Sequence, residues 1–153
     1  MGAVEAPNTT YRPSIPKSIV DKGQLSDIQL EAVVYAGHAH SQLLPAAEGE
    51  KPVRRGFFIG DGTGVGKGRE IAGIILDNWN QGRKKAVWLS ISQKLFEDAK
   101  RDWAGIGQDP GKIINLSKVK SGESKAVGAT EGIMFSTYGT LNGKPAKGLS
   151  RIE

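Results

Sequence analysis

The sequence predicts an α/β fold built around a parallel β-sheet. Short apolar runs, each the length of a buried strand, alternate along the chain with longer stretches whose apolar residues recur at helical spacing. One strand-to-helix junction, residues 60–68, holds five glycines and a lysine. Because strands that alternate with helices are joined by crossovers, this order indicates a parallel sheet.

The first part of the chain predicts an extended lead-in followed by one helix. Residues 1–24 contain three prolines among scattered polar residues, which argues against regular structure there. Residues 25–44 predict a helix, because Ser26 is a good N-cap and an apolar face follows it. Residues 45–55 combine proline, glycine and charge, and we expect a loop.

The remaining elements alternate between strand and helix. The apolar triplet at residues 57–59 predicts a short buried strand, and a helix over residues 67–79 follows the glycine-rich junction. Three more strands and one helix come next, with a polar loop or weak helix before the last strand. Their expected ranges are strands at 86–92, 112–116 and 132–138, the helix at 93–104 and the polar segment at 117–131.

The composition is that of an ordinary globular protein. At 153 residues the chain has the size of about one domain. No apolar run approaches the ~20 residues that span a bilayer, and the N-terminus lacks the layout of a signal peptide. The absence of cysteine excludes a disulfide framework and a thiolate metal site. We therefore expect no membrane partner and a cytoplasmic protein, or a nuclear one in a eukaryote.

Positive charge is concentrated in one stretch of the chain. The formal net charge is +5, and residues 83–125 carry ten Lys or Arg against five Asp or Glu. The rest of the chain carries eleven of each sign. This asymmetry indicates a polyanionic partner such as nucleic acid, and a solvated basic face without a partner explains it equally well.

The glycine-rich junction resembles a phosphate-binding loop. The pattern Gly-x-x-x-x-Gly-Lys-Ser/Thr ends here in Gly66-Lys67, while Asp61 takes the first glycine position and Gly68 the place of the hydroxyl residue. Glycines let successive backbone N–H groups turn toward phosphate oxygens, and Lys67 supplies a cation. A dinucleotide fingerprint fails in every frame, because its last position falls on Val65, Lys67 or Arg69. The plainer alternative is a tight turn with a solvated lysine.

Longer blocks around this loop identify a family. The stretch "FFIGDGTGVGKGREIAGIILDNW", with "LSDIQLEAVVYAGHAH" before it and "RKKAVWLSISQKLFEDAKRDW" and "GIMFSTYGTL" after it, resembles the strawberry notch family over residues 11–153. That family consists of helicase-like P-loop NTPases of superfamily two. The loop "GDGTGVGKGR" is specific to the family, and a glycine follows the lysine there as well. The resemblance implies an incomplete RecA-like α/β fold, with residues 25–153 as the N-terminal part of the first motor domain.

The resemblance also implies ligands and site residues. ATP and Mg²⁺ are the implied cofactors, and nucleic acid is the implied partner. The residues alone do not separate DNA from RNA, and we expect DNA. The implied nucleotide-binding residues are Gln29, where the superfamily places an adenine-reading glutamine, and Gly62, Thr63, Gly64, Val65, Gly66, Lys67, Gly68 and Arg69. The implied nucleic-acid-binding residues are Ser90, Ser92, Lys94, Thr137 and Thr140.

Several of these residues have a structural explanation that stays open. Ser26-x-x-Gln29 is also a capping box, in which Gln29 satisfies the start of a helix. Ser92 is equally plausible as an N-cap, Lys94 as part of a solvated helix face, and the two threonines as residues of a strand end and a turn. A metal site is not expected at His38 and His40, because they diverge on a helix and have no third ligand nearby.

The residues for ATP hydrolysis are not all present. Turnover needs a carboxylate pair after a later strand, and the adjacent pair Glu97-Asp98 lies inside a predicted helix instead. By the resemblance, the Asp-Glu motif and the rest of the motor would follow Glu153. We expect the ATP-binding part of a helicase-like ATPase of bacterial or phage origin, from a helicase–methyltransferase-type protein. A non-hydrolysing nucleotide- or nucleic-acid-binding module and an inactive fragment are the alternatives.

Overall fold

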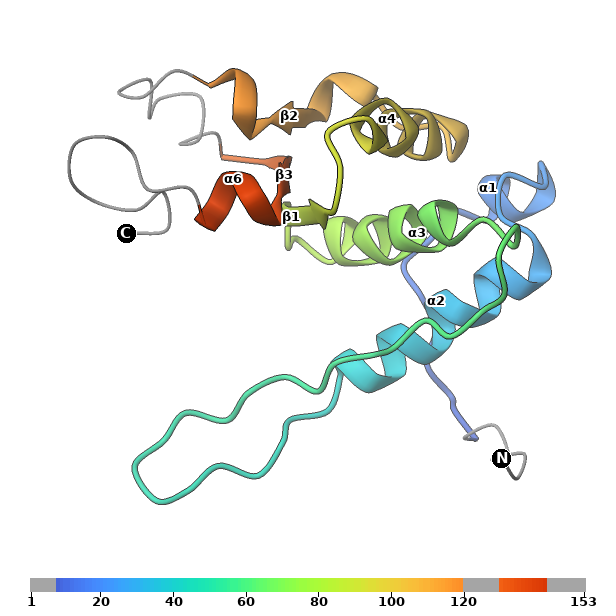
Figure 1. The fold of residues 1–153 in the computed structure, drawn as a ribbon. Coiled ribbons are helices and arrows are strands. Elements are labelled where there is room, and N and C mark those ends of the chain that lie inside the picture. Colours follow the sequence, from blue (N-terminus) through green and yellow to red (C-terminus); the bar gives the residue numbers. More distant parts are fainter. Residues whose placement is uncertain (1–7, 120–129, 143–153) are drawn as a thin grey trace. The chain divides into compact units, whose positions relative to one another are not determined.

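The computed structural model describes residues 8–119 and 130–142 and divides the chain into two compact units (Figure 1). The first unit is Met1–Gln81 and the second is Gly82–Glu153. Helices make up the regular structure of the first unit, and a parallel sheet with helices makes up the second. The predicted α/β class is therefore confirmed, and it is consistent with a P-loop NTPase domain.

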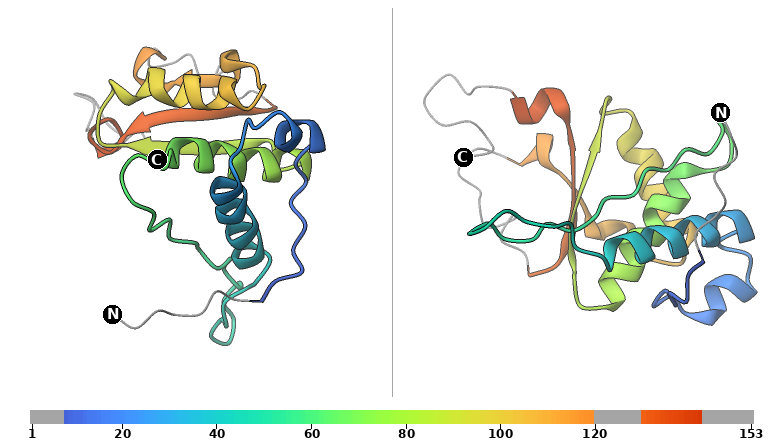
Figure 2. Two further views of the ribbon diagram at one scale, coloured as in Figure 1. Left: turned by 90° about the vertical axis from the view of Figure 1, so that its right-hand side faces the viewer. Right: turned by 90° about the horizontal axis from the view of Figure 1, so that it is seen from below.

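Two long helices build the first unit. Helix α2 spans Asp27–His40 and helix α3 spans Lys67–Asn80, and the two pack against each other (Figure 2). Their interface is apolar and close. A Cβ placed on Gly73 of α3 would lie 2.7 Å from Cγ2 of Val33 on α2, so the helices could not approach as they do with a larger residue there. The shared core comprises Leu25, Val33, Ala36, Ala72 and Leu76.

The lead-in is held against these helices by one buried carboxylate. Asp77 is only 1% exposed and accepts hydrogen bonds from the Tyr11 hydroxyl at 2.7 Å and from the backbone N–H of Ser14 at 2.6 Å. Gln81 donates to the same carboxylate at 2.7 Å. Beyond these contacts the chain forms the short helix α1, Lys17–Asp21, within the stretch for which no helix was expected. Pro16, which precedes the helix, was the available signal.

The predicted strand at residues 57–59 is wrong. The segment is extended but pairs with no strand in the described part of the chain, and Phe58 is 87% exposed. The β-pairing described in the first unit is a single antiparallel bridge between Leu43 and Arg54. A strand needs a neighbouring backbone to receive its hydrogen bonds, and the neighbours of this triplet are helices. The apolar run alone therefore does not decide its conformation.

The second unit contains a three-stranded parallel sheet in the order β1-β3-β2. Strand β1 is Lys85–Ser90, β2 is Ile113–Asn115 and β3 is Gly132–Thr137. Ser90 pairs with Thr137 in register, so the carboxyl ends of β1 and β3 coincide. The three strands expected after the glycine loop are thus confirmed, with ends shifted by one or two residues.

Helices complete the second unit. Helix α4 spans Leu95–Gly105, and α6 spans Tyr138–Asn142. Two short 3₁₀ turns, η1 at Pro110–Lys112 and η2 at Leu116–Lys118, flank β2. The indole N–H of Trp103 donates to the Asp109 carbonyl at 3.1 Å, which joins the end of α4 to the turn before β2. The core gathers Trp103, Ile106, Ile133 and Phe135.

Removing the Asp77 carboxylate should destabilise the first unit. Asp77→Ala leaves the Tyr11 hydroxyl and the Ser14 N–H without their charged acceptor, which should lower the free energy of unfolding by about 2–4 kcal/mol. Urea denaturation measures the difference. Asp98→Ala is the matched control, because its partner Arg101 is an exposed side chain and such pairs contribute less than about 1 kcal/mol. Equal losses for the two variants would contradict the anchoring role of Asp77.

Candidate functional site

The glycine loop bends sharply into the start of α3. Gly64 and Gly66 have φ angles of 94° and 91°, in the left-handed region that other residues rarely adopt. Gly66 is the N-cap residue of α3, so the loop delivers the chain directly to the first turn of a 14-residue helix. The free N–H groups and the dipole of a helix N-terminus favour anions at this position.

Lys67 lies across the loop that precedes it. Its Nζ donates to the carbonyl of Asp61 at 2.8 Å and to the carbonyl of Gly62 at 2.9 Å. Both acceptors are neutral, and an anionic phosphate oxygen forms a stronger hydrogen bond with an ammonium group. The side chain is thus held at the loop by partners that phosphate oxygens can displace.

Gln29 connects α2 to the loop. Its Oε1 accepts from the Ser26 N–H at 3.1 Å and its backbone N–H donates to the Ser26 hydroxyl at 3.3 Å, which completes the capping box. Its Nε2 donates to the carbonyl of Val65 at 2.8 Å. The helix-capping role of Gln29, which the sequence left open as an alternative, is therefore present. A Cβ on Gly66 would lie 2.7 Å from the same Nε2, so this contact also favours glycine there.

The other implied nucleotide-binding residues have mixed surroundings. Thr63 and Gly64 are exposed on the loop, whereas Gly68 lies in the first turn of α3. Arg69 donates from Nη1 to the carbonyl of Gln24 at 2.8 Å, so its guanidinium group contacts the backbone before α2. The loop residues and Lys67 therefore come together, while Arg69 has a structural contact of its own.

A buried acidic side chain that the sequence did not single out as a site residue lies beside the loop. Glu70 is 0% exposed, and neither of its carboxyl oxygens has a hydrogen-bond donor among the described residues. Burial raises the pKa of Glu70, and the charge of Asp61 raises that pKa further, while the charge of Lys67 lowers it. The available signal was its position three residues after Lys67, because residues at this spacing share one face of a helix.

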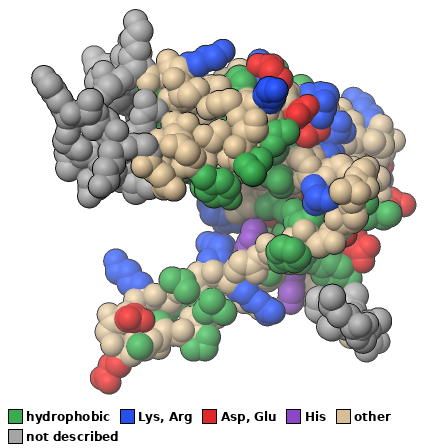
Figure 3. Space-filling model, in the orientation of Figure 1, with side chains coloured by type: hydrophobic (Ala, Val, Ile, Leu, Met, Phe, Trp, Pro, Cys, Tyr) green, Lys and Arg blue, Asp and Glu red, His purple; other side chains and the backbone are tan. Residues whose placement is uncertain are grey.

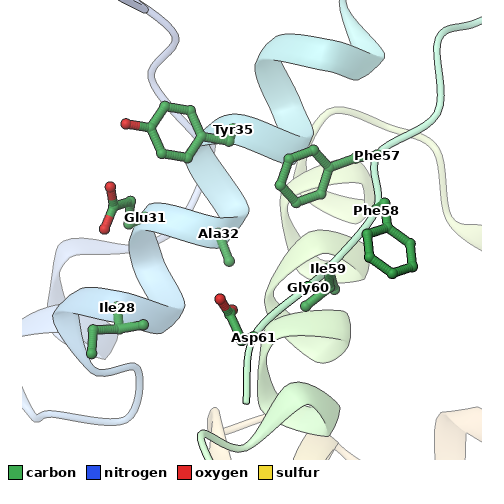
Figure 4. A pocket seen from close by; sticks show the side chains of 9 residues that line it. All are labelled: Ile28, Glu31, Ala32, Tyr35, Phe57, Phe58, Ile59, Gly60 and Asp61. Atoms are coloured by element: carbon green, nitrogen blue, oxygen red, sulfur yellow. The ribbon is translucent and has the colours of Figure 1, made fainter. Parts of the chain in front are cut away.

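A pocket of about 270 Å³ adjoins the beginning of the loop (Figure 4). Figure 4 shows the carboxylate of Asp61 directed toward α2, while the Phe58 ring points away from that helix. Gln29 does not line this pocket. The lining residues are Ile28, Glu31, Ala32, Tyr35, Phe57, Phe58, Ile59, Gly60 and Asp61.

In the second unit, the polar residues implied in nucleic-acid binding lie at the carboxyl ends of β1 and β3, where Ser90 and Thr137 are the last strand residues, or shortly after them. The Thr137 and Thr140 hydroxyls are 2.9 Å apart, and the Thr140 N–H donates to Thr137 Oγ1 at 3.2 Å. The Ser92 hydroxyl accepts from the Lys94 N–H at 3.2 Å, just before α4. The turn role that was left open for the two threonines is therefore present, whereas Ser92 is not the N-cap of α4: that residue is Lys94, and no side chain caps the helix. The carboxyl ends of parallel strands are also where α/β proteins bind ligands.

Much of the positive charge in the second unit lies next to acidic side chains. In Figure 3, Lys and Arg over α4 stand beside Asp and Glu, as expected from the pairs Lys100–Glu97 at 3.4 Å and Arg101–Asp98 at 2.7 Å. The acidic pair that the sequence placed inside a helix thus makes surface ion pairs there. On the sheet, Glu131 pairs with Lys84 at 3.2 Å and with Lys112 at 2.7 Å, and these contacts lower the pKa of Glu131.

A family model described as "P-loop containing NTP hydrolase pore-1" matches residues 1–153. The chain belongs to this family. It is 44% identical over 151 residues to protein strawberry notch homolog 1 of Gallus gallus, with 97% of this chain and 12% of that protein covered. Protein FORGETTER 1 of Arabidopsis thaliana is 43% identical over 155 residues, with 100% and 12% covered. Protein strawberry notch homolog 2 of Homo sapiens is 43% identical over 148 residues, with 97% and 10% covered.

These matches confirm the resemblance to the strawberry notch family. The chain spans about a tenth of the length of the curated relatives it matches. The expected bacterial or phage origin is not supported, because these relatives are animal and plant proteins. No solved structure is significantly similar to the chain. Among the described residues, no helix is long and apolar enough to cross a membrane.

Two substitutions at Gln29 should separate its two contacts. Gln29→Glu keeps an oxygen for the Ser26 N–H but cannot donate to the Val65 carbonyl, whereas Gln29→Ala loses both contacts. We expect Gln29→Ala to reduce the free energy of unfolding by about 1–2 kcal/mol, the range for a lost cap and hydrogen bond, and Gln29→Glu to reduce it less. Urea unfolding monitored by circular dichroism tests the order, and the opposite order would contradict the capping role.

Proposed function

We propose that this chain is the ATP-binding portion of a helicase-like, superfamily-two, nucleic-acid-dependent ATPase. The observation that carries the proposal is the glycine loop with Lys67 across it at the start of α3. A lysine held by neutral carbonyls at a helix N-terminus can exchange those acceptors for phosphate oxygens without a change in the fold. The membership of the chain in a P-loop NTP hydrolase family supports the same activity.

The loop has the room that phosphates require. A Cβ built on Gly62 or on Gly64 would meet no atom within 4 Å, so the backbone there is open to close approach by a ligand. In the proposed complex, backbone N–H groups of residues 62–68 bind phosphate oxygens, and Lys67 moves from the two carbonyls to the β- and γ-phosphates. Thr63 and Val65 contribute through their backbone N–H groups, because their side chains carry no charge.

The fit to Mg²⁺ is weaker than the fit to the phosphates. Gly68 provides no hydroxyl oxygen at the position where P-loops usually bind the ion. Mg²⁺ usually keeps several waters and binds nucleotide phosphates directly, so it would enter as the counter-ion of ATP. This ion neutralises phosphate charge when bound, and the loop itself contributes backbone N–H groups and Lys67.

Gln29 is the proposed contact to adenine. Its Oε1 accepts from the Ser26 N–H and its Nε2 donates to the Val65 carbonyl, and each of the two atoms has capacity for one further hydrogen bond. The second N–H of Nε2 is therefore available to a base while both contacts remain. Base recognition and loop geometry are then coupled through one side chain.

Nucleic acid is the proposed partner of the second unit, and we expect DNA. The polar side chains at and after the carboxyl ends of β1 and β3 include hydroxyls suited to phosphate oxygens, and Lys94 adds a cation after β1. Contacts of this kind follow the sugar-phosphate backbone of the nucleic acid and depend little on its base sequence.

A chain that binds nucleotide without hydrolysing it is the second candidate. Two observations favour it: Gly68 lacks a hydroxyl, and the carboxylates of Glu97 and Asp98 are engaged in surface ion pairs on α4. Phosphate release by the purified chain with Mg²⁺ and DNA, compared with Lys67→Ala, separates the two functions. Turnover that Lys67→Ala abolishes would exclude the second candidate.

Lys67→Ala should weaken nucleotide binding. Loss of the charge-assisted hydrogen bonds to phosphate should cost about 1.5–3 kcal/mol, or about 10- to 150-fold in Kd. Calorimetric titration with a non-hydrolysable ATP analogue measures the affinity. Lys17→Ala is the control, because it removes an exposed lysine from α1 of the same unit. Equal affinities of Lys67→Ala and the unmodified chain would contradict the phosphate-binding role.

The second unit should bind DNA in a salt-dependent manner. Lys94→Ala should weaken binding to all sequences alike and reduce the slope of log K against log salt by about one. Arg101→Ala is the matched control and should change the slope less, because Arg101 already pairs with Asp98. Fluorescence anisotropy with single- and double-stranded DNA and RNA over a salt series measures both quantities. Absence of binding at low salt would show that the basic stretch is only a solvated surface.

A further inference from the structure

The pocket beside the glycine loop has no part in the proposed contacts to ATP. One wall is a single face of α2, on which Ile28, Glu31 and Tyr35 recur at intervals of three and four residues. The other wall is the extended segment 57–61, and both walls belong to the first unit. Its volume of about 270 Å³ is just below the roughly 300–1,000 Å³ of sites that enclose drug-sized ligands, so the pocket suits one side chain.

The pocket is lined by two carboxylates, Glu31 on the helix wall and Asp61 on the loop wall. The Asp61 carboxylate is directed toward α2 (Figure 4). Within residues 8–119 and 130–142, no Lys or Arg lines the pocket and no ion pair involves either carboxylate. Lys67 donates to the backbone carbonyl of Asp61, which leaves the carboxylate for another partner. A concave surface lined by charge of one sign attracts the opposite charge, so the pocket favours a cation.

Two aromatic rings determine which cation fits best. Figure 4 shows the Phe57 ring directed toward α2, from which Tyr35 projects. Burial raises the pKa of Tyr35, and the charge of Glu31 raises that pKa further, which keeps the phenol neutral at neutral pH. The face of a neutral ring attracts cations, and a guanidinium group also stacks on it because the group is planar and weakly hydrated. The pocket therefore favours a guanidinium group over a strongly hydrated ammonium group.

The apolar side chains of the same pocket indicate a polypeptide ligand. Ile28 is 58% exposed and Phe58 is 87% exposed, and the Phe58 ring points away from α2 (Figure 4). Aromatic residues and arginine are enriched in protein interfaces, where they fill pockets on the partner. A free small cation gains nothing from exposed apolar side chains, whereas the apolar neighbours of an arginine in a polypeptide can pack on them.

We propose that this pocket binds an arginine side chain of a partner polypeptide. The guanidinium group donates to the carboxylates of Glu31 and Asp61 and stacks on the Phe57 ring. Apolar residues next to the arginine pack on Ile28 and Phe58. The site uses none of the proposed contacts to ATP, so it is a second binding site of the first unit.

The direct test uses the unmodified chain and a short peptide with blocked termini, acetyl-Leu-Arg-Leu-amide. The control peptide replaces arginine by citrulline, which has nearly the same shape but no charge. The backbone amide resonances of Glu31, Ala32, Gly60 and Asp61 should shift in ¹⁵N spectra as the arginine peptide is added. The citrulline peptide should bind about tenfold more weakly, and added salt should reduce this difference. Equal affinities for the two peptides, or no shift at millimolar arginine peptide, would overturn the proposal.

Three variants separate the carboxylates from the aromatic wall. Asp61→Asn and Glu31→Gln should each weaken binding of the arginine peptide by up to about fivefold, the range for exposed ion pairs, and should leave the citrulline peptide unaffected. Phe57→Leu keeps an apolar wall without an aromatic face, so it should reduce the preference for arginine over citrulline. Unchanged affinity for the arginine peptide in both carboxylate variants would overturn the proposal.

Glu48→Gln is the matched control, because Glu48 is an exposed carboxylate of the same unit that does not line the pocket. It should bind the arginine peptide as the unmodified chain does. A loss as large as that of Asp61→Asn would show that the charge of the whole unit attracts the peptide, and would overturn the assignment to the pocket.

Adenosine distinguishes this pocket from a nucleotide site. It is a neutral probe of the base and sugar of ATP, and it should not displace the arginine peptide. Displacement would assign the pocket to the nucleotide and would overturn the proposal. Because the peptide is titrated without nucleotide, a failure of the proposed ATP binding would leave this result unaffected.

Discussion

The close packing of α2 on α3 is the constraint on which the candidate nucleotide site depends. Gly73 allows the helices to approach until its backbone meets Val33, and this approach brings Gln29 within hydrogen-bonding distance of the loop. The loop itself has no strand beside it in the described part of the first unit. Its geometry is therefore set by glycines with left-handed backbone conformations and by two side-chain donors. The Gln29 amide donates to the Val65 carbonyl, and the Lys67 ammonium donates to the Asp61 carbonyl.

Short-range sequence patterns correctly predicted the helices and strands that depend mainly on neighbouring residues. The capping box at Ser26 and Gln29, the helix that begins at Lys67 and the apolar strands of the second unit all appear where the sequence indicated. The failures concern features that depend on distant partners. Residues 57–59 have the composition of a strand but lack a neighbouring backbone to pair with, and α1 formed in a proline-containing stretch with a core contact at Ile19.

The site residues show the same division. The loop glycines and Lys67 could be predicted as candidates, because a glycine-rich turn followed by a lysine at the start of a helix is typical of phosphate-binding loops, and their binding role stays a prediction. Glu70 could not, since a glutamate in the first turn of a helix is usually solvated and favoured by the dipole. Its burial comes from tertiary packing, which periodicity does not report. Asp61 was recognised as a departure from the loop pattern, and its charge raises the pKa of the buried Glu70.

The electrostatics of the second unit limit how it can bind a polyanion. Four of the basic residues in the stretch with excess positive charge, Lys84, Lys100, Arg101 and Lys112, make ion pairs with Glu or Asp. Exposed pairs of this kind are weak, so phosphates can compete for the cations, but each exchange leaves a carboxylate close to the polyanion. Attraction to the proposed nucleic acid would then come mainly from cations without an acidic neighbour, because Thr137 at the end of β3 is only 8% exposed and its hydroxyl already lies 2.9 Å from that of Thr140.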